Sequence, residues 1–216
     1  MKLSTKKILD ECINNFPLLE QCKQEIIKAF DILVECFKNN GKLLVCGNGG
    51  SCADAGHIVG ELMNKFGKKR ALLENEIKKI KESSLSENDK NFLLCHLQKS
   101  FPAISLCVHT SLITAISNDE DAEMIYAQQV YGYGKEGDVL LAISTSGNSK
   151  NILRALMTAK VFKIKTIGLT GKNGGKMKEH NCDVLICVPE EITYKIQQLH
   201  LPVYHCLCGM IEEELS

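Results

Sequence analysis

A run of hydroxyl side chains follows a short apolar segment in the second half of the chain. Residues 139–143 are all apolar, and four hydroxyl residues follow within six positions, namely Ser144, Thr145, Ser146 and Ser149. A helical pattern of apolar residues begins directly afterwards. A strand, a hydroxyl-rich turn and a helix N-terminus together direct uncharged O–H and N–H donors at an anion. One such hydroxyl would indicate a helix cap, whereas this density predicts a phosphate cradle.

A second turn of the same design lies near the first third of the chain. Residues 42–46 have the pattern of a strand, and a helix is expected over about 52–66. Between them stand the candidate substrate-binding residues Asn48, Gly49, Gly50 and Ser51. A glycine-rich turn alone is weak, because many such turns only lead a strand into a helix. Together with the hydroxyl-rich turn it indicates a site for a sugar or an anion.

Histidine, glutamate and glutamine side chains recur at helical spacing in two other places. His57 and Glu61 are four residues apart on the helix after the glycine-rich turn, so they share one face. A C-terminal helix is expected over 191–214, and it carries Gln197, Gln198, His200 and His205. Gln197 and His205 stand about 80° apart around that axis. Spacing alone prefers Gln197 with His200, or Gln198 with His205, and leaves the choice open.

The elements that must position these residues alternate along the chain. Helices are expected over about 4–15 and 17–39, with Pro17 suited to a first helical position. Strands are expected at 42–46, 103–107, 139–143, 164–169 and 183–188. Short apolar runs that alternate with helices predict an α/β fold with a parallel sheet covered on both faces. Ligands of such sheets bind beyond the carboxyl ends of the strands, where both turns fall.

Two segments stand apart from this alternation. Residues 67–100 are rich in charge and contain a helix start at Ser86, so we expect a helical hairpin inserted into a single domain spanning 1–216. Its charges favour a solvated face, although it could also cover the site or extend a subunit contact. The N-terminal helices, residues 1–40, carry an apolar stripe that includes Ile26, Phe30, Leu33 and Phe37. We expect this stripe to pack against a partner subunit.

Composition narrows the class of protein. The 216 residues include 26 Lys and Arg and 26 Asp and Glu, which gives a formal net charge of zero. This balance argues against a nucleic-acid surface or a polybasic membrane patch. No apolar run approaches the length of a membrane span, and the N-terminus lacks the apolar region of a signal peptide. The 11 cysteines are scattered without a C-x-x-C pair, as in the reducing cytoplasm, where we expect the protein.

The motifs, taken in order, resemble the sugar isomerase (SIS) domain of bacterial phosphoheptose isomerases. They are GNGGS, D-A-x-H-x-x-x-E, N-D, ISTSGNS, T-G-x-x-G-G-K and I-Q-x-x-H-x-x-x-x-H, and the resemblance covers about 40–216. It implies a three-layer flavodoxin-like fold with a five-stranded parallel sheet. It also implies a homotetramer with sites at subunit interfaces. The implied reaction is interconversion of sedoheptulose 7-phosphate and D-glycero-D-manno-heptose 7-phosphate through an enediol.

The resemblance also assigns roles to residues. It implies zinc bound by His57, Glu61, Gln197 and His205, a nitrogen and oxygen donor set that zinc accepts. Enediol chemistry needs a base and an acid, for which we take Glu61 and His205. A glutamate held tightly by a metal is a poorer base, so its role as base or ligand stays open. Asn118 and Asp119 would contact a sugar hydroxyl or assist proton transfer, although Asp119 also suits a plain turn.

The chain departs from the family pattern at several positions. Tyr194 stands where an aspartate is common, and Lys65 replaces an arginine, which removes bidentate geometry toward a phosphate. Residues 120–123 and the insertion also differ. The alternatives are therefore a non-catalytic phosphosugar-binding or partner-binding SIS protein, and an isomerase or lyase of another sugar phosphate. Retention of the four implied zinc ligands favours an enzyme, because a binding protein needs only the two turns.

Overall fold

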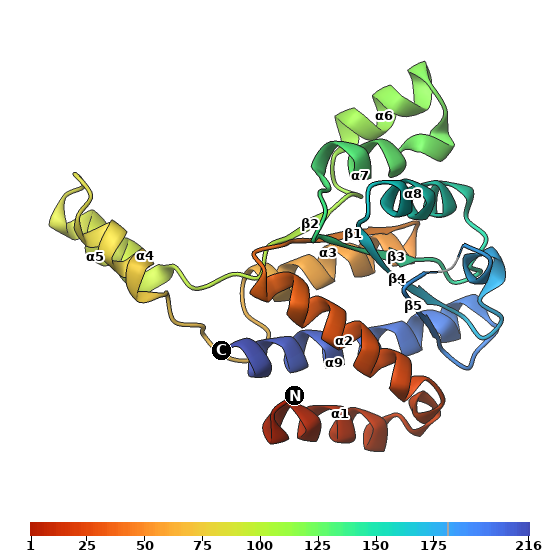
Figure 1. Ribbon diagram of the computed structural model, residues 1–216, viewed down its shortest axis with the longest axis horizontal. Coiled ribbons are helices and arrows are strands. Elements are labelled where there is room, and N and C mark those ends of the chain that lie inside the picture. Colours follow the sequence, from red (N-terminus) through yellow and green to blue (C-terminus); the bar gives the residue numbers. More distant parts are fainter. Residues whose placement is uncertain (181) are drawn as a thin grey trace.

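A five-stranded parallel sheet forms the centre of the molecule (Figure 1). The computed structural model describes residues 1–180 and 182–216. The strands are β1 (Leu43–Gly47), β2 (Ala103–Ser105), β3 (Val139–Ile143), β4 (Lys165–Thr170) and β5 (Val184–Cys187). They lie in the order β2-β1-β3-β4-β5, and every neighbouring pair is parallel. The predicted α/β fold and its flavodoxin-like strand order are confirmed.

Helices cover both faces of this sheet. On one face lie α2 (Lys23–Lys38), α3 (Gly50–Met63) and α9 (Thr193–Leu215), with α1 (Leu3–Asn15) packed outside α9. The other face is covered by α7 (Ala127–Tyr133) and α8 (Lys150–Val161). Alternation within β1 serves both sides, because Leu43 and Val45 join the first hydrophobic cluster while Leu44 and Cys46 join the second. Burial on both faces explains the continuous apolar runs in the sequence.

The N-terminal stripe is covered within its own chain, so the predicted need for a partner was wrong. Pro17 begins a 3-10 helix, η1 (Pro17–Cys22), which leads into α2. On α2 the side chains of Ile26, Phe30 and Leu33 are at most 2% exposed. They lie in one cluster with residues of β5 and α9. The sequence pattern shows only that this face of α2 is apolar. It does not show that α9, far away in the chain, covers it.

Smaller differences concern the region after the insertion. The predicted strand at 103–107 is only three residues long, as befits an edge strand that pairs with β1 alone. The helix that follows, α6 (Thr110–Asp119), includes Asn118 and Asp119, which were expected in a turn. After it come a 3-10 turn, η2 (Ala122–Met124), and α7. A third 3-10 segment, η3 (Gly175–Lys178), precedes β5.

The inserted segment forms a hairpin that projects away from the sheet (Figure 1). Its helices are α4 (Glu74–Lys81) and α5 (Glu87–His96). Ser86 caps α5 as predicted, because its hydroxyl accepts the N–H of Asp89 at 3.2 Å. Where the segment leaves α3, the buried Glu212 carboxylate of α9 accepts three successive backbone N–H groups at 2.7–3.0 Å, from Phe66, Gly67 and Lys68.

A buried arginine completes the root of the hairpin. Arg70 is 3% exposed, and its guanidinium donates to the carbonyl oxygens of Leu62 and Asn64. It also lies over the Phe101 ring, 4.5 Å from the ring centroid. Among the described residues, no helix is long and apolar enough to cross a membrane.

Candidate active site

The two predicted turns meet at the carboxyl edge of the sheet. Because β1 and β3 are neighbours, the turns that follow them lie side by side at the point where the strand order reverses. Reciprocal amide hydrogen bonds of 2.9 Å join Asn48 in the first turn to Asn151 at the start of α8. Between the turns is a cavity of about 280 Å³. Its lining includes Asn48, Gly49, Gly50, Ser51, Ser144, Thr145, Ser149, Thr193 and Gln197.

Glycines bring a third element to this cavity. Gly49 is the N-cap residue of α3 and has φ +55°, a backbone conformation that residues other than glycine rarely adopt. A Cβ at Gly50 would overlap the side-chain amide of Gln197 from α9. Gly50 therefore lets α9 place Gln197 directly against the first turn. Thr193, also from α9, lines the cavity and was missed, because one threonine at a helix start carries no distinctive signal.

The hydroxyls of the second turn face the cavity without capping the helix. Ser144 is 4% exposed, and its hydroxyl lies 3.1 Å from that of Ser149. Ser149 is the N-cap residue of α8, yet its side chain makes no capping hydrogen bond. Ser146 differs, since its exposed hydroxyl accepts the N–H of Asn148 at 3.2 Å and is absent from the cavity lining. The structure thus gathers Ser144, Thr145 and Ser149, but leaves Ser146 on the turn's outer side.

The cradle is electrically neutral. Among the described residues that line the cavity there is no lysine, arginine, aspartate or glutamate. Its donors are hydroxyls, side-chain amides and the backbone at the start of α3 and α8. Donors of this kind, with the positive ends of two helix dipoles, suit a phosphate group.

A cluster of titratable side chains lies further along α3 and α9. The Nε2 atom of His57 is 3.0 Å from Oε1 of Glu61, which confirms that the two share one helix face. The His57 and His205 rings stand edge to face, with centroids 4.9 Å apart. One possible ligand atom from each of His57, Glu61 and His205 lies within 4.8 Å of the others. The structure therefore unites His205 with the α3 pair.

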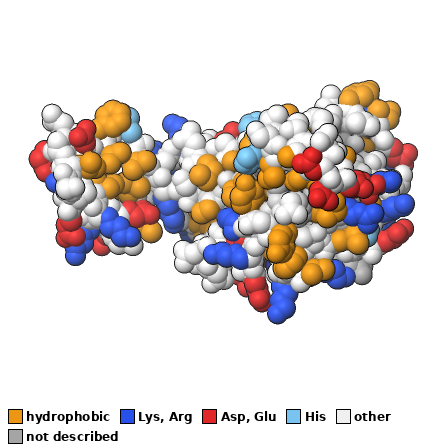
Figure 2. Space-filling view, turned by 90° about the horizontal axis from the view of Figure 1, so that it is seen from above, with side chains coloured by type: hydrophobic (Ala, Val, Ile, Leu, Met, Phe, Trp, Pro, Cys, Tyr) orange, Lys and Arg blue, Asp and Glu red, His pale blue; other side chains and the backbone are white. Residues whose placement is uncertain are grey.

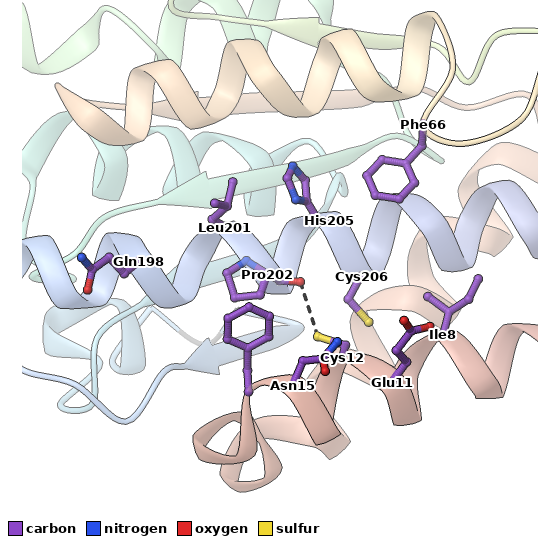
Figure 3. A pocket seen from close by; sticks show the side chains of 11 residues that line it. Ile8, Glu11, Cys12, Asn15, Phe66, Gln198, Leu201, Pro202, His205 and Cys206 are labelled. Atoms are coloured by element: carbon purple, nitrogen blue, oxygen red, sulfur yellow. Dashed lines mark hydrogen bonds between the residues drawn. The ribbon is translucent and has the colours of Figure 1, made fainter.

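His205 carries an unused nitrogen. Its side chain rises from α9 toward Phe66, whose ring centroid is 5.5 Å away (Figure 3). The Nε2 atom is buried and has no hydrogen-bond partner in the described part of the chain. Burial, with a further contribution from His57, lowers the pKa of His205. A neutral imidazole with an unpaired nitrogen is the form that binds a metal, so the three side chains fit a metal ion.

Two residues that the sequence analysis left without a role orient His57. The Tyr204 hydroxyl lies 3.0 Å from Nδ1 of His57 and donates to Oδ1 of Asp54 at 3.4 Å. The Tyr204 hydroxyl thus links the His57 ring to Asp54, and it holds Nε2 of His57 beside Glu61. Burial raises the pKa of Asp54. The three-residue spacing of Asp54 and His57 was the available signal.

Other predicted residues lie outside this three-residue cluster. Gln197 lines the cradle and stands eight positions before His205 on α9, about 12 Å along the helix axis. Its role as a fourth ligand beside His57, Glu61 and His205 stays a prediction. Asn118 and Asp119 are exposed at the end of α6, where the Asn118 amide donates to the Asp119 carboxylate at 2.7 Å. Neither of them lines the cradle.

Comparison with known proteins agrees with this geometry. A SIS domain family model matches residues 16–93 and 97–171. The phosphoheptose isomerase of Nitratiruptor sp. is 42% identical over 194 residues, which are 90% of this chain and 88% of the relative. That of Rhodospirillum rubrum is 38% identical over 93% of this chain and 91% of its own.

Solved structures give the same result. A phosphoheptose isomerase from Neisseria gonorrhoeae superposes with a TM-score of 0.73 at 31% identity, covering 94% of both chains. One from Francisella tularensis has a TM-score of 0.72 at 33% identity, covering 97% of this chain and 93% of its own. The chain belongs to the SIS-domain family, in the group of the phosphoheptose isomerases.

Proposed function

We propose that this protein is an aldose–ketose isomerase that interconverts sedoheptulose 7-phosphate and D-glycero-D-manno-heptose 7-phosphate. One observation carries the proposal, namely that α3 and α9 join a neutral anion cradle to a separate group of two histidines and a glutamate. The offset of about 12 Å between Gln197 and His205 suits a substrate with its phosphate at one end and its reacting carbons at the other. The phosphoheptose isomerase relatives support the same reaction.

In this proposal the cradle binds the phosphate end of the sugar. Ser51, Ser144, Thr145 and Ser149 donate hydroxyl hydrogen bonds to its oxygens. The amides of Asn48 and Gln197 bind the adjoining sugar hydroxyls, while Gly49 and Gly50 let the ligand approach the backbone. Ser146 belongs to the same turn and would join the cradle only by changing its present hydrogen bond to Asn148.

Proton transfer takes place at the other end. Glu61 removes the proton from C2 of the aldose, the C1 carbonyl oxygen takes a proton from His205, and an enediol results. Glu61 then returns its proton to C1 while His205 takes up the C2 hydroxyl proton, which completes the ketose and restores both side chains. Tyr204 and Asp54 are positioning residues, because they hold the His57 ring in place beside Glu61.

Zinc is the cofactor that this donor set suits best. His57, Glu61 and His205 would hold it, and Gln197 is the fourth ligand that the family resemblance implies. When bound, the metal supplies Lewis-acid polarisation of the substrate carbonyl. Glu61 then serves as a loosely held ligand or as the base, and the variant experiments below distinguish these roles.

We further infer a homotetramer with sites at subunit interfaces. His57 is exposed, and a second cavity of about 350 Å³ opens beside His205 between α1 and α9 (Figure 3). Surfaces this open beside reacting groups are what a neighbouring subunit would close. Asn118 and Asp119 would then serve the site of a neighbouring chain. The free thiols of the 11 cysteines suit a cytoplasmic location.

Incubation with sedoheptulose 7-phosphate tests the proposal. We expect NMR to show the anomeric signals of a heptose 7-phosphate aldose, which grow until the two sugars reach equilibrium. Ketose that binds but is never converted, by protein supplied with zinc, would instead indicate a non-catalytic phosphosugar-binding protein. Metal analysis of the purified protein tests the cofactor separately.

A further inference from the structure

The inserted hairpin lacks a core of its own. No residue from 71 to 97 is buried, although the segment contains two helices of 8 and 10 residues. Isolated helices shorter than about 12–15 residues are marginal in water, and tertiary packing of an apolar face supplies most helix stability. The hairpin projects from the body, and only its base lies near it, where Leu73 and Glu76 line one cavity with Phe37 and Phe101 (Figure 1). Packing against another surface would supply the missing stabilisation.

Apolar side chains gather on this projection. Ile77, Ile80, Leu93 and Leu94 are only partly covered. Leu73 and Leu97 are each 47% exposed, and Phe92 is 62% exposed. Figure 2 shows a hydrophobic area on the separate lobe.

A groove of about 510 Å³ runs along the base of the hairpin. Its apolar lining consists of Ala71, Leu72, Ile77, Leu94 and Leu97. The charged residues that line it are all cations, namely Lys69, Arg70 and Lys81. No acidic residue among those described lines the groove, so a suitable occupant presents apolar side chains next to carboxylates.

The start of α4 has that composition. Leu73 is the N-cap residue, and the acidic residues of the first turn are Glu74 and Glu76. The Glu76 carboxylate already accepts the N–H of Leu73 at 2.8 Å. Neither Glu74 nor Lys81 forms an ion pair within the described part of the chain. Glu74 and Lys81 are seven residues apart, so they lie on one face at opposite ends of α4.

We propose that this hairpin is a docking surface for the same hairpin of a second copy of the chain. About a two-fold axis, antiparallel α4 helices bring Glu74 of each copy to Lys81 of the other, and Leu73 of each into the other's groove. Such an arrangement is isologous, so the same ion pair between Glu74 and Lys81 forms twice. The hairpin is held for this role by its root, where Lys99 donates its N–H to the Arg70 carbonyl at 3.2 Å.

This contact is separate from the proposed catalysis. None of the residues that line the cradle lies in the hairpin, and neither do His57, Glu61 and His205. Variants of the hairpin surface therefore test association without altering the proposed site.

Amide hydrogen exchange of the full-length protein measures the contact directly. We expect amides of α4 and α5 to exchange at least tenfold faster in Leu73→Asp than in the parent, while those of α8 are unchanged. Aspartate at an N-cap strengthens an isolated helix, so faster exchange would report lost docking and not a weakened helix. Equal exchange rates in the parent and the variant would overturn the proposal. The hairpin would then be a solvated appendage or a surface for a different partner.

A charge exchange supplies the second test. Glu74→Lys and Lys81→Glu should each accelerate exchange in the hairpin, and the double variant should return it to within about threefold of the parent. Helix-dipole effects alone predict that the double variant is worst, since it places a cation at the N-terminus and an anion at the C-terminus. Lys79→Glu, on the opposite face of α4, is the matched control and should change little. A double variant that exchanges faster than both single variants would contradict the two-fold pairing.

Discussion

The two ends of the α3 and α9 pair are built in different ways. At the cradle, each turn follows its own strand directly, and the donors are uncharged groups of the turns and helix starts. At the other end, titratable side chains come from α3 and from α9, which begins 130 positions after α3 ends. One of their nitrogens, Nε2 of His205, has no partner in the described residues. Binding and proton transfer are therefore assigned to separate groups, which variants should affect separately.

Glu61→Gln should produce the largest effect. The carboxamide retains the shape of the side chain but cannot act as a base, so we expect kcat to fall by about 10²–10⁴-fold while KM changes little. Steady-state kinetics of the two variants Glu61→Gln and Glu179→Gln, an exposed carboxylate elsewhere, measure this. An increase in KM at unchanged kcat would move Glu61 from catalysis to binding and so remove the difference between the two ends.

Removal of cradle hydroxyls should have the reverse signature. A hydrogen bond to a charged group contributes about 1.5–3 kcal/mol, so Ser149→Ala should raise KM by about one to two decades with kcat nearly constant. Ser146→Ala is the matched control in the same turn, and its effect should be smaller because Ser146 lies outside the cavity lining. Equal effects of the two substitutions would show that the turn rearranges around its ligand.

Tyr204→Phe tests the metal at the histidine end. Loss of a partner that orients a metal-binding histidine typically weakens metal affinity by about 10–100-fold. We expect this loss for zinc in a titration against a competing chelator, with the KM for substrate unaffected once zinc is saturating. Thermal unfolding of the metal-free protein is the control, because Tyr204 is 2% exposed. Unchanged zinc affinity would show that Tyr204 does not orient His57 for metal binding.

Lys65→Arg should produce the smallest effect. Lys65 is exposed just beyond the end of α3 and does not line the cradle. Exposed substitutions usually change free energies by less than about 0.5 kcal/mol, so KM should stay within about threefold of the parent. A tenfold fall in KM would mean that the region around Lys65, just beyond the end of α3, also binds the phosphate.

Local pattern was enough to predict the strands and the meeting of the two turns at one edge of the sheet. The turn residues are contiguous with strands β1 and β3, whose apolar runs are unambiguous, and parallel pairing then places both turns at one edge. The same holds for His57 and Glu61, because helix geometry fixes their common face. Spacing along the chain does not show which side chains of α3 meet which side chains of α9. Several partners for His205 therefore stayed open, and Tyr204 and Asp54 received no role.

Burial by distant elements was also beyond local pattern. The stripe of Ile26, Phe30 and Leu33 was correctly identified as a buried face, but the sequence does not show that α9 and β5 cover it. The predicted tetramer therefore loses that argument and stays a prediction, as does the role of Asp119. In the hairpin the situation is reversed, since the charge pattern indicated a solvated face and the structure adds an uncovered apolar groove.

Deuterium uptake from solvent tests the central claim most directly. Sedoheptulose 7-phosphate incubated in D₂O with the parent protein should gain deuterium at C1, and the aldose formed should carry it at C2. In Ser149→Ala this exchange should recover at high substrate concentration, whereas in Glu61→Gln it should be lost at every concentration. Exchange at the parent's rate in Glu61→Gln would contradict the assignment of proton transfer to the α3 and α9 cluster.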